Sequence, residues 1–88
     1  MNTHKTIIHS TCPINGSWDY YDLVLETSEF IKCEDVDEIA NLVRGVRQTQ
    51  EEIADTLRHL FRGKLTNFKL TLEGRHGQNN ELKICLAA

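Results

Sequence analysis

Hydrophobic and polar positions alternate with a period of two near both ends of the chain and with a helical period in the middle. The clearest two-residue alternation covers residues 18–27, WDYYDLVLET, whose aromatic and branched side chains are typical of a strand. A shorter run at residues 6–9 precedes it as a second predicted strand. Along 18–27, one face carries Asp19, Tyr21, Leu23 and Leu25, and the other carries Tyr20, Asp22, Val24 and Glu26.

Two amphipathic helices are predicted at residues 34–44 and 49–61. Acidic residues at the start of the first helix and Arg44 at its end suit the helix dipole, and Gly45 provides a stop. Thr49 and Glu52 form the capping-box pattern that begins the second helix. The apolar stripes consist of Val36, Ile39, Ala40 and Val43 in the first helix, and of Ile53, Ala54, Leu57, Leu60 and Phe61 in the second.

The period of two returns after Gly63 and predicts strands at residues 68–72 and 82–86, joined by a hairpin loop at 73–81. The order strand, strand, helix, helix, strand, strand predicts one α+β domain over residues 1–88. We expect a four-stranded antiparallel sheet with both helices on one face (ββααββ). The expected core is Val36, Ile39, Val43, Ile53, Leu57, Leu60, Leu23, Leu25, Leu70 and Ile84.

Composition and charge narrow the class of protein further. The 88 residues are 40% hydrophobic and 26% charged, as in ordinary globular proteins, and carry a net charge of −3. No apolar run approaches the roughly 20 residues of a membrane span, and no signal-peptide pattern opens the chain, so we expect a cytoplasmic protein. Residues 22–38 hold seven acidic residues and one basic residue, whereas residues 44–75 hold seven basic and four acidic. This distribution agrees with two interpretations. The charges form two solvated faces, or the basic part forms a weakly basic surface for an anionic partner such as RNA.

The three cysteines, Cys12, Cys33 and Cys85, are widely spaced and include no CxxC pair. This pattern favours reduced thiols over a disulfide framework. A zinc site would need these cysteines and a histidine without the local ligand pair that usually begins such sites. We therefore predict no structural metal.

The segment CPINGSWD at residues 12–19 predicts a rigid bend at the mouth of the long strand. Pro13 biases Cys12 toward an extended backbone, and Asn15-Gly16 is typical of a tight turn. Asp19 follows seven residues after Cys12 and can fold back toward the thiol as an acid or a base. Cys12 is thus either a small buried hydrophobic residue or a nucleophile.

Two further residues are candidates for ligand binding. Because Glu52 already serves the capping box, Glu51 is available to accept two hydrogen bonds from the N–H and NH2 edge of a guanine or pterin ring. The alternative is that Glu51 only complements the helix dipole. His76 lies in the predicted hairpin loop, where binding residues are common.

Residues 12–19 resemble the Cys-Pro-x-Thr-Gly-Gln-Pro-Asp motif of the nitrile reductases of queuosine biosynthesis. These enzymes belong to the tunnelling-fold superfamily, together with GTP cyclohydrolase I and the pyruvoyl-tetrahydropterin synthases, and the predicted element order is also that of the superfamily. The resemblance implies that Cys12 attacks a nitrile to give a thioimide and that Asp19 donates the proton. It also implies that Glu51 anchors the purine and that Glu34 corresponds to a second glutamate of the family.

The chain departs from the family after Glu34, where the acidic residues Asp35, Asp37 and Glu38 occupy a stretch that contains serine and lysines in the reductases. Because these charges repel a phosphorylated dinucleotide, we expect no bound cofactor and no tight NADPH binding. Gln50 stands where the family usually has histidine. Related amidinotransferases act on tRNA to make archaeosine, but the net charge of −3 does not support tRNA binding here.

The expected function is therefore a nitrile-reductase-like Cys/Asp site that forms a thioimide with a 7-deazapurine nitrile. The alternative is a non-catalytic purine- or pterin-binding module, or a structural oligomerisation module, of the same fold. Tunnelling-fold sheets close into barrels between subunits, so the resemblance implies a homo-oligomer with a small purine-like ligand as its other partner.

Overall fold

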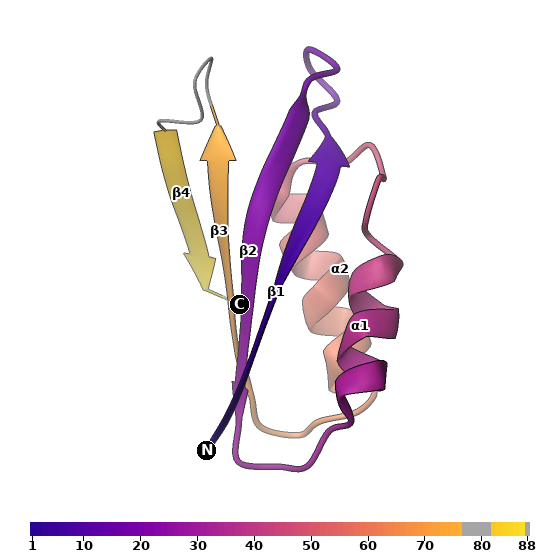
Figure 1. Ribbon diagram of the computed structural model, residues 1–88, viewed down its shortest axis with the longest axis vertical. Coiled ribbons are helices and arrows are strands. Elements are labelled where there is room, and N and C mark those ends of the chain that lie inside the picture. Colours follow the sequence, from indigo (N-terminus) through magenta and orange to yellow (C-terminus); the bar gives the residue numbers. More distant parts are fainter. Residues whose placement is uncertain (77–81, 88) are drawn as a thin grey trace.

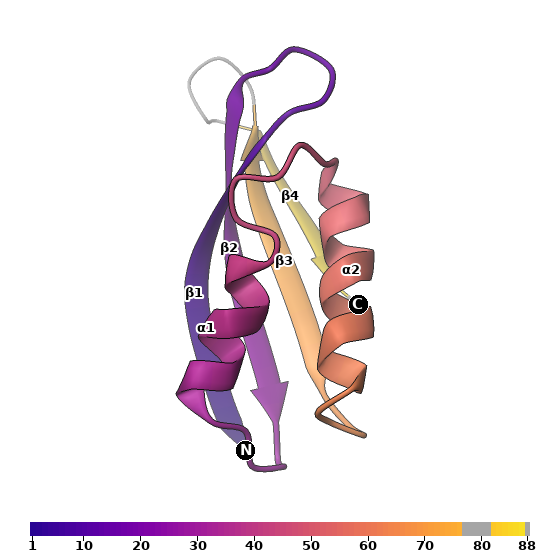
Figure 2. The same cartoon turned by 90° about the vertical axis from the view of Figure 1, so that its right-hand side faces the viewer.

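The computed structural model describes residues 1–76 and 82–87, and it shows an antiparallel sheet with two helices packed on the same face (Figures 1 and 2). The strands follow the order β1-β2-β3-β4 across the sheet. This arrangement confirms the predicted α+β class. The elements are β1 (Asn2–Thr11), β2 (Trp18–Thr27), α1 (Cys33–Asn41), α2 (Gln50–Arg62), β3 (Lys69–His76) and β4 (Leu82–Ala87).

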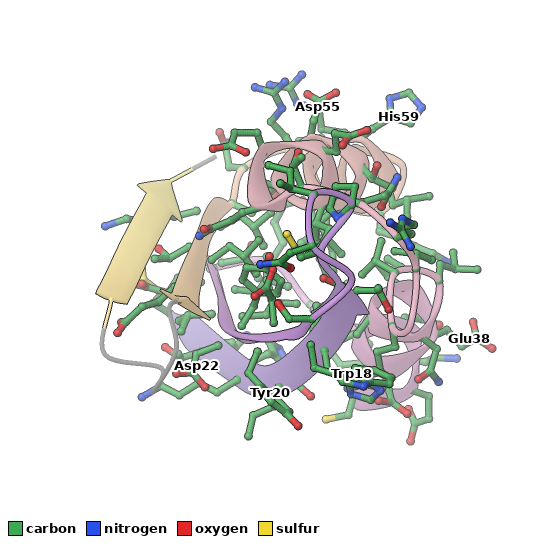
Figure 3. The ribbon with its side chains drawn as sticks, turned by 90° about the horizontal axis from the view of Figure 1, so that it is seen from above. Trp18, Tyr20, Asp22, Glu38, Asp55 and His59 are labelled. Atoms are coloured by element: carbon green, nitrogen blue, oxygen red, sulfur yellow. The ribbon has the colours of Figure 1, made fainter. Side chains whose placement is uncertain are left out.

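Strand β2 presents its two faces as the alternation predicts. The inward residues are Asp19, Tyr21, Leu23 and Leu25, and each is no more than 7% exposed. Seen from above, Trp18, Tyr20 and Asp22 point away from the helices (Figure 3). Since successive side chains of a strand face opposite sides, Asp19 and Tyr21 share the helix-covered side of the sheet.

Strand β1 is longer than the four residues that the sequence predicts. It pairs with β2 along its whole length, from Asn2 opposite Thr27 to Thr11 opposite Trp18. The hydrophobic pattern identified only the middle of β1, because most of its inward and outward positions are polar. Backbone pairing with the complete edge of β2 supplies the stability that side-chain hydrophobicity does not.

Helix α1 ends at Asn41, three residues before the predicted end at Arg44. The N–H groups of the next two residues bond to carbonyls three positions back, at Ile39 and Ala40, which tightens the chain into a turn. Gly45 then adopts a φ of 76° and redirects the backbone. The sequence predicted that Gly45 would stop a helix ending at Arg44, whereas the helix has already ended at Asn41. The prediction that Arg44 complements the dipole of the last turn is therefore wrong.

The connection between α1 and α2 instead lies along the outer edge of β1. Gly45 N donates to His9 O at 2.7 Å, and Thr11 N donates to Val46 O at 3.0 Å. The Arg44 guanidinium donates to Ile7 O at 3.2 Å. These bonds satisfy backbone groups that an edge strand otherwise exposes, and they hold the end of β1 in place.

Helix α2 begins as the capping box predicts. The Thr49 hydroxyl accepts from Glu52 N at 3.2 Å, and a Glu52 carboxylate oxygen accepts from Thr49 N at 3.0 Å. Both partners of the predicted pair are therefore used. Glu51 takes no part in this cap.

The core lies between the sheet and the two helices. Eight of the predicted core residues are buried: Leu23, Leu25, Val36, Ile39, Val43, Ile53, Leu57 and Leu70. Leu60 is only partly buried and packs at the margin of this core. The prediction for Ile84 concerns a side chain that lies outside the described residues. In the described part of the chain, neither helix is long and apolar enough to cross a membrane.

The predicted hairpin loop of residues 73–81 begins later than the sequence suggests. Strand β3 continues to His76, which pairs with Leu82 of β4, so His76 belongs to a strand end and not to the loop. Cross-strand pairing extends β3 through Gly74, where the alternation of side chains gave no strand signal. The remaining loop positions, 77–81, lie outside the described residues.

At the lower end of the sheet, Glu29 joins the turn after β2 to the turn before β3. Its carboxylate accepts from Asn67 N at 2.6 Å and from the Thr66 hydroxyl at 3.0 Å. The backbone N–H groups of Asn67 and Thr66 hold the pKa of Glu29 below its ordinary value of 4.5. The carboxylate form therefore fastens two segments that are far apart in the sequence.

We expect Glu29→Gln to destabilise the protein at neutral pH and to matter less in acid. Because the folded-state pKa of Glu29 is depressed, its contribution is complete above the unfolded value near 4.5 and is lost as the pH falls through the folded value. Urea unfolding of both proteins at pH 7 and pH 3 measures this. Glu38→Gln, which removes one exposed charge from α1, controls for net charge, and a difference that is as large at pH 3 as at pH 7 would contradict the prediction.

Candidate functional site

The turn between β1 and β2 has the rigid geometry that residues 12–19 predict. Gly16 N donates to Cys12 O at 2.8 Å, and Cys12 N donates to Ser17 O at 2.8 Å, so the turn closes on itself. The Asn15 side-chain oxygen accepts from Ser17 N at 3.0 Å, and Gly16 has a φ of 74°, which favours glycine. These bonds fix the backbone on both sides of the Cys12 thiol.

This turn is also tied to the connection between the helices. Arg47 donates from its guanidinium to Pro13 O at 3.2 Å, and Thr11 forms a parallel bridge with Arg47. The start of α2 follows directly after this connection. The turn and the first residues of α2 are therefore held at the same end of the sheet, as Figure 2 shows.

A pocket of about 200 Å³ opens between the β1–β2 turn, the start of β2 and the start of α2. Three of the predicted site residues, Cys12, Asp19 and Glu51, lie in its wall. Cys12 is half-buried and Asp19 is buried, whereas Glu51 is exposed at the rim. The complete lining is Cys12, Pro13, Ile14, Asp19, Tyr21, Thr49, Gln50 and Glu51.

Asp19 shares the buried wall of this pocket with Tyr21. The Tyr21 hydroxyl donates to Asp19 Oδ2 at 3.5 Å. Burial raises the pKa of Tyr21 to about 12, and the negative charge of the neighbouring Asp19 acts in the same direction. Tyr21 is therefore a neutral hydrogen-bond donor throughout the physiological range of pH.

The start of α2 supplies the opposite wall. The Gln50 side chain is buried and donates from Nε2 to Leu72 O of β3 at 2.9 Å, which fastens the first turn of the helix onto the sheet. With Thr49 and Glu52 occupied by the cap, the carboxylate of Glu51 stands at the pocket rim. A carboxylate in this position can accept two hydrogen bonds from the edge of a ring that carries neighbouring N–H groups.

The other two predicted binding residues lie apart from this pocket. Glu34 is exposed in the first turn of α1, which begins at the end of the sheet opposite the β1–β2 turn (Figure 1). Within one chain, Glu34 does not join Cys12 and Asp19 in the pocket. His76 ends β3, and its side chain lies outside the described residues.

Among the side chains that the structure describes, no three of the types His, Cys, Asp or Glu are grouped as metal ligands. Cys12 and Cys33 are both free, the first half-buried and the second exposed. The absence of a structural metal stays a prediction.

Sequence reasoning missed Tyr21 and Gln50 as parts of the site. The signal for Tyr21 was present, because the strand alternation already placed it on the same face as Asp19. Gln50 was noted only as a replacement for the histidine of the family. Its role in the site depends on a bond to Leu72 of β3, which lies 22 residues further along the chain.

The fold and the placement of this pocket define an α+β protein in which two helices cover one face of an antiparallel sheet and the pocket lies at the start of the second helix. A solved structure with a similar fold is the crystal structure of the archaeosine synthase QueF-Like in the apo form. It aligns with a TM-score of 0.83 and 18% sequence identity, over 99% of this chain and 89% of that chain. At this identity the likeness concerns the fold alone. No protein-family model matches the sequence, and no curated protein matches it.

Proposed function

We propose that this chain is a tunnelling-fold protein whose Cys12 forms a covalent thioimide with the nitrile of a 7-deazapurine. The observation that carries the proposal is the pocket itself. It gathers a thiol, a buried carboxylate and an exposed carboxylate from three segments, Cys12, Asp19 and Glu51. The resemblance of residues 12–19 to the motif of the nitrile reductases supports the same chemistry.

Each residue has a separate task in the proposed reaction. The sulfur of Cys12 adds to the nitrile carbon, and one π bond of the nitrile opens. Asp19 accepts the thiol proton and transfers it to the nitrile nitrogen, so the product is a neutral thioimide and no further reactant is needed. Glu51 accepts hydrogen bonds from the N–H and NH2 edge of the purine and orients the ring.

Later steps that need a second reactant are not part of the proposal. The acidic residues that follow Glu34 oppose the phosphates of a nicotinamide dinucleotide, so reduction by NADPH is not expected. The net charge of −3 gives no support to tRNA as the carrier of the purine. The proposed ligand is therefore a free, small, purine-like nitrile.

Intact-protein mass spectrometry after incubation with 7-cyano-7-deazaguanine tests the proposal. A covalent gain of one ligand mass is expected. The non-catalytic alternative predicts ligand affinity by calorimetry without any gain in mass, and a purely structural module predicts neither. An unmodified mass at saturating ligand would overturn the thioimide.

We also propose that the protein is a homo-oligomer whose pocket is completed by a second copy. The pocket volume of about 200 Å³ is below the range of about 300–1,000 Å³ usual for small-molecule sites. Ile14, which lines the pocket, is 87% exposed. Glu34 is not among the lining residues, because α1 begins at the opposite end of the sheet (Figure 1). Sedimentation velocity is expected to show an assembly, and a monomer at high protein concentration would contradict this prediction.

A further inference from the structure

A buried polar cluster lies directly behind the pocket, on the inner face of β1 and β2. Ser10 and Asp19 are opposite each other in the register of the two strands, and Tyr21 lies two residues beyond Asp19 on the same face. Their exposed fractions are 0% for Ser10, 7% for Asp19 and 1% for Tyr21. Hydroxyl and carboxylate groups are costly to bury in a core of this kind, so a cluster of three needs a reason.

Within the cluster, the contact that reaches the pocket is the one from Tyr21 to Asp19. The phenol hydroxyl donates to Asp19 Oδ2 at 3.5 Å. This distance is long for an O–H···O bond, and such contacts in sites without ligand commonly shorten when the reacting complex forms. Both residues line the pocket together with Cys12.

The surroundings of the phenol determine the direction of this hydrogen bond. Burial, with the nearby charge of Asp19, raises the pKa of Tyr21 to about 12. The side chain of Ser10, beside the phenol, acts in the opposite direction and lowers the pKa. Tyr21 therefore keeps its proton at neutral pH and can act as a donor to the carboxylate, but not as a base.

We propose that Tyr21 is a positioning residue for Asp19, and that its buried hydroxyl holds Oδ2 so that the other carboxylate oxygen is presented to the Cys12 thiol. This inference rests on the proposed function for its meaning, because it assigns Asp19 the transfer of the thiol proton. It adds a residue that the motif does not contain. Tyr21 itself does not touch the reacting atoms.

The first test compares Tyr21→Phe with Tyr20→Phe. Phenylalanine keeps the ring of Tyr21 in the core and removes only the hydroxyl, whereas Tyr20 is 47% exposed on the opposite face and serves as the matched control. The rate of thioimide formation is expected to fall about 10-fold in Tyr21→Phe, less than the roughly 100-fold or greater loss expected for Asp19→Asn. Tyr20→Phe is expected to react like the original protein.

A second measurement does not need the nitrile. Alkylation of Cys12 by iodoacetamide, followed by peptide mass, gives a pH–rate profile for the thiol alone. Without the Tyr21 hydroxyl, the Asp19 charge is less well neutralised, so the profile of Tyr21→Phe is expected to move to higher pH. In the Asp19→Asn background, Tyr21→Phe is expected to have no further effect, because the hydroxyl acts through that carboxylate. An equal effect in both backgrounds would overturn the inference.

A spectroscopic measurement covers the case in which Tyr21→Phe does not fold. The chain has two tyrosines, so 3-fluorotyrosine in the Tyr20→Phe variant labels Tyr21 alone. Its fluorine resonance is expected to shift in Asp19→Asn and to stay in place in Asp22→Asn, whose side chain points away from the helices (Figure 3). A resonance that does not shift in Asp19→Asn would refute the contact between Tyr21 and Asp19.

These outcomes separate the inference from the proposed function. If no ligand mass is gained but the alkylation profile moves as described, the thioimide fails and the positioning role of Tyr21 stands. If the adduct forms at the same rate in Tyr21→Phe and the alkylation profile is unchanged, the thioimide stands and the role of Tyr21 fails.

Discussion

Replacing Cys12 with alanine is expected to abolish the covalent adduct with 7-cyano-7-deazaguanine while leaving the fold intact. The half-buried thiol supplies the only sulfur in the wall of the described pocket, and alanine has no atom that can add to the nitrile carbon. The backbone bonds of the turn, from Gly16 N to Cys12 O and from Cys12 N to Ser17 O, do not use the side chain. Circular dichroism should therefore be unchanged when the mass gain disappears.

Cys33→Ala provides the matched control for this experiment. Cys33 is exposed at the start of α1, away from the pocket, so its removal is expected to leave the adduct and its rate unchanged. Peptide mapping of the adduct then assigns the modified residue. An adduct that survives Cys12→Ala, or one that is lost only in Cys33→Ala, would show that the pocket is not the reacting site.

The largest expected effect on stability is that of Phe61→Ala. Phe61 is completely buried in the last turns of α2, and its ring centroid lies 6.2 Å from that of Phe68, which precedes β3. Truncation removes the apolar area and leaves a cavity between the helix and the sheet, at a cost of about 3–5 kcal/mol. Because domains of this size have about 5–15 kcal/mol in total, much of the stability should be lost. The free energy of unfolding in urea measures the change.

Phe30→Ala is the control for the same chemical substitution at a different place. Phe30 is 82% exposed in the segment between β2 and α1. In a monomer, truncating its side chain should therefore change the free energy of unfolding by less than about 0.5 kcal/mol. A loss at Phe30 as large as that at Phe61 would show that an assembly covers Phe30. A small loss at Phe61 would contradict the packing of α2 on the sheet.

Several elements follow from local rules and were predicted correctly. The alternation of residues 18–27 gives β2 and both of its faces, since a strand places successive side chains on opposite sides. The pair Thr49 and Glu52 gives the start of α2, because both partners of a capping box lie within one turn of the helix. Asn15 and Gly16 likewise give the turn that holds Cys12.

The errors concern elements whose limits depend on segments far away in the sequence. β1 extends beyond residues 6–9 because β2 offers a complete partner, and His76 belongs to β3 because β4 pairs with it. Helix α1 ends early because the residues that follow it bond to β1. Gly45 bonds to His9, which lies 36 positions earlier in the chain, and Arg44 bonds to Ile7, which lies 37 positions earlier. No pattern within α1 contains this information.

The sequence by itself determined the helical and strand periods, the cap of α2 and the bend at Cys12, because these depend on side chains only a few residues apart. It also determined that Asp19 and Tyr21 share a face. Only the tertiary structure decided that Glu51 meets Cys12 at one pocket and that Glu34 does not. That outcome depends on how α2 packs across the sheet, where the buried Gln50 bonds to Leu72 and the stripe of α2 fills the core. Such packing is a property of the whole core, since close-packed side chains from distant segments must fit together before any one helix has a fixed position.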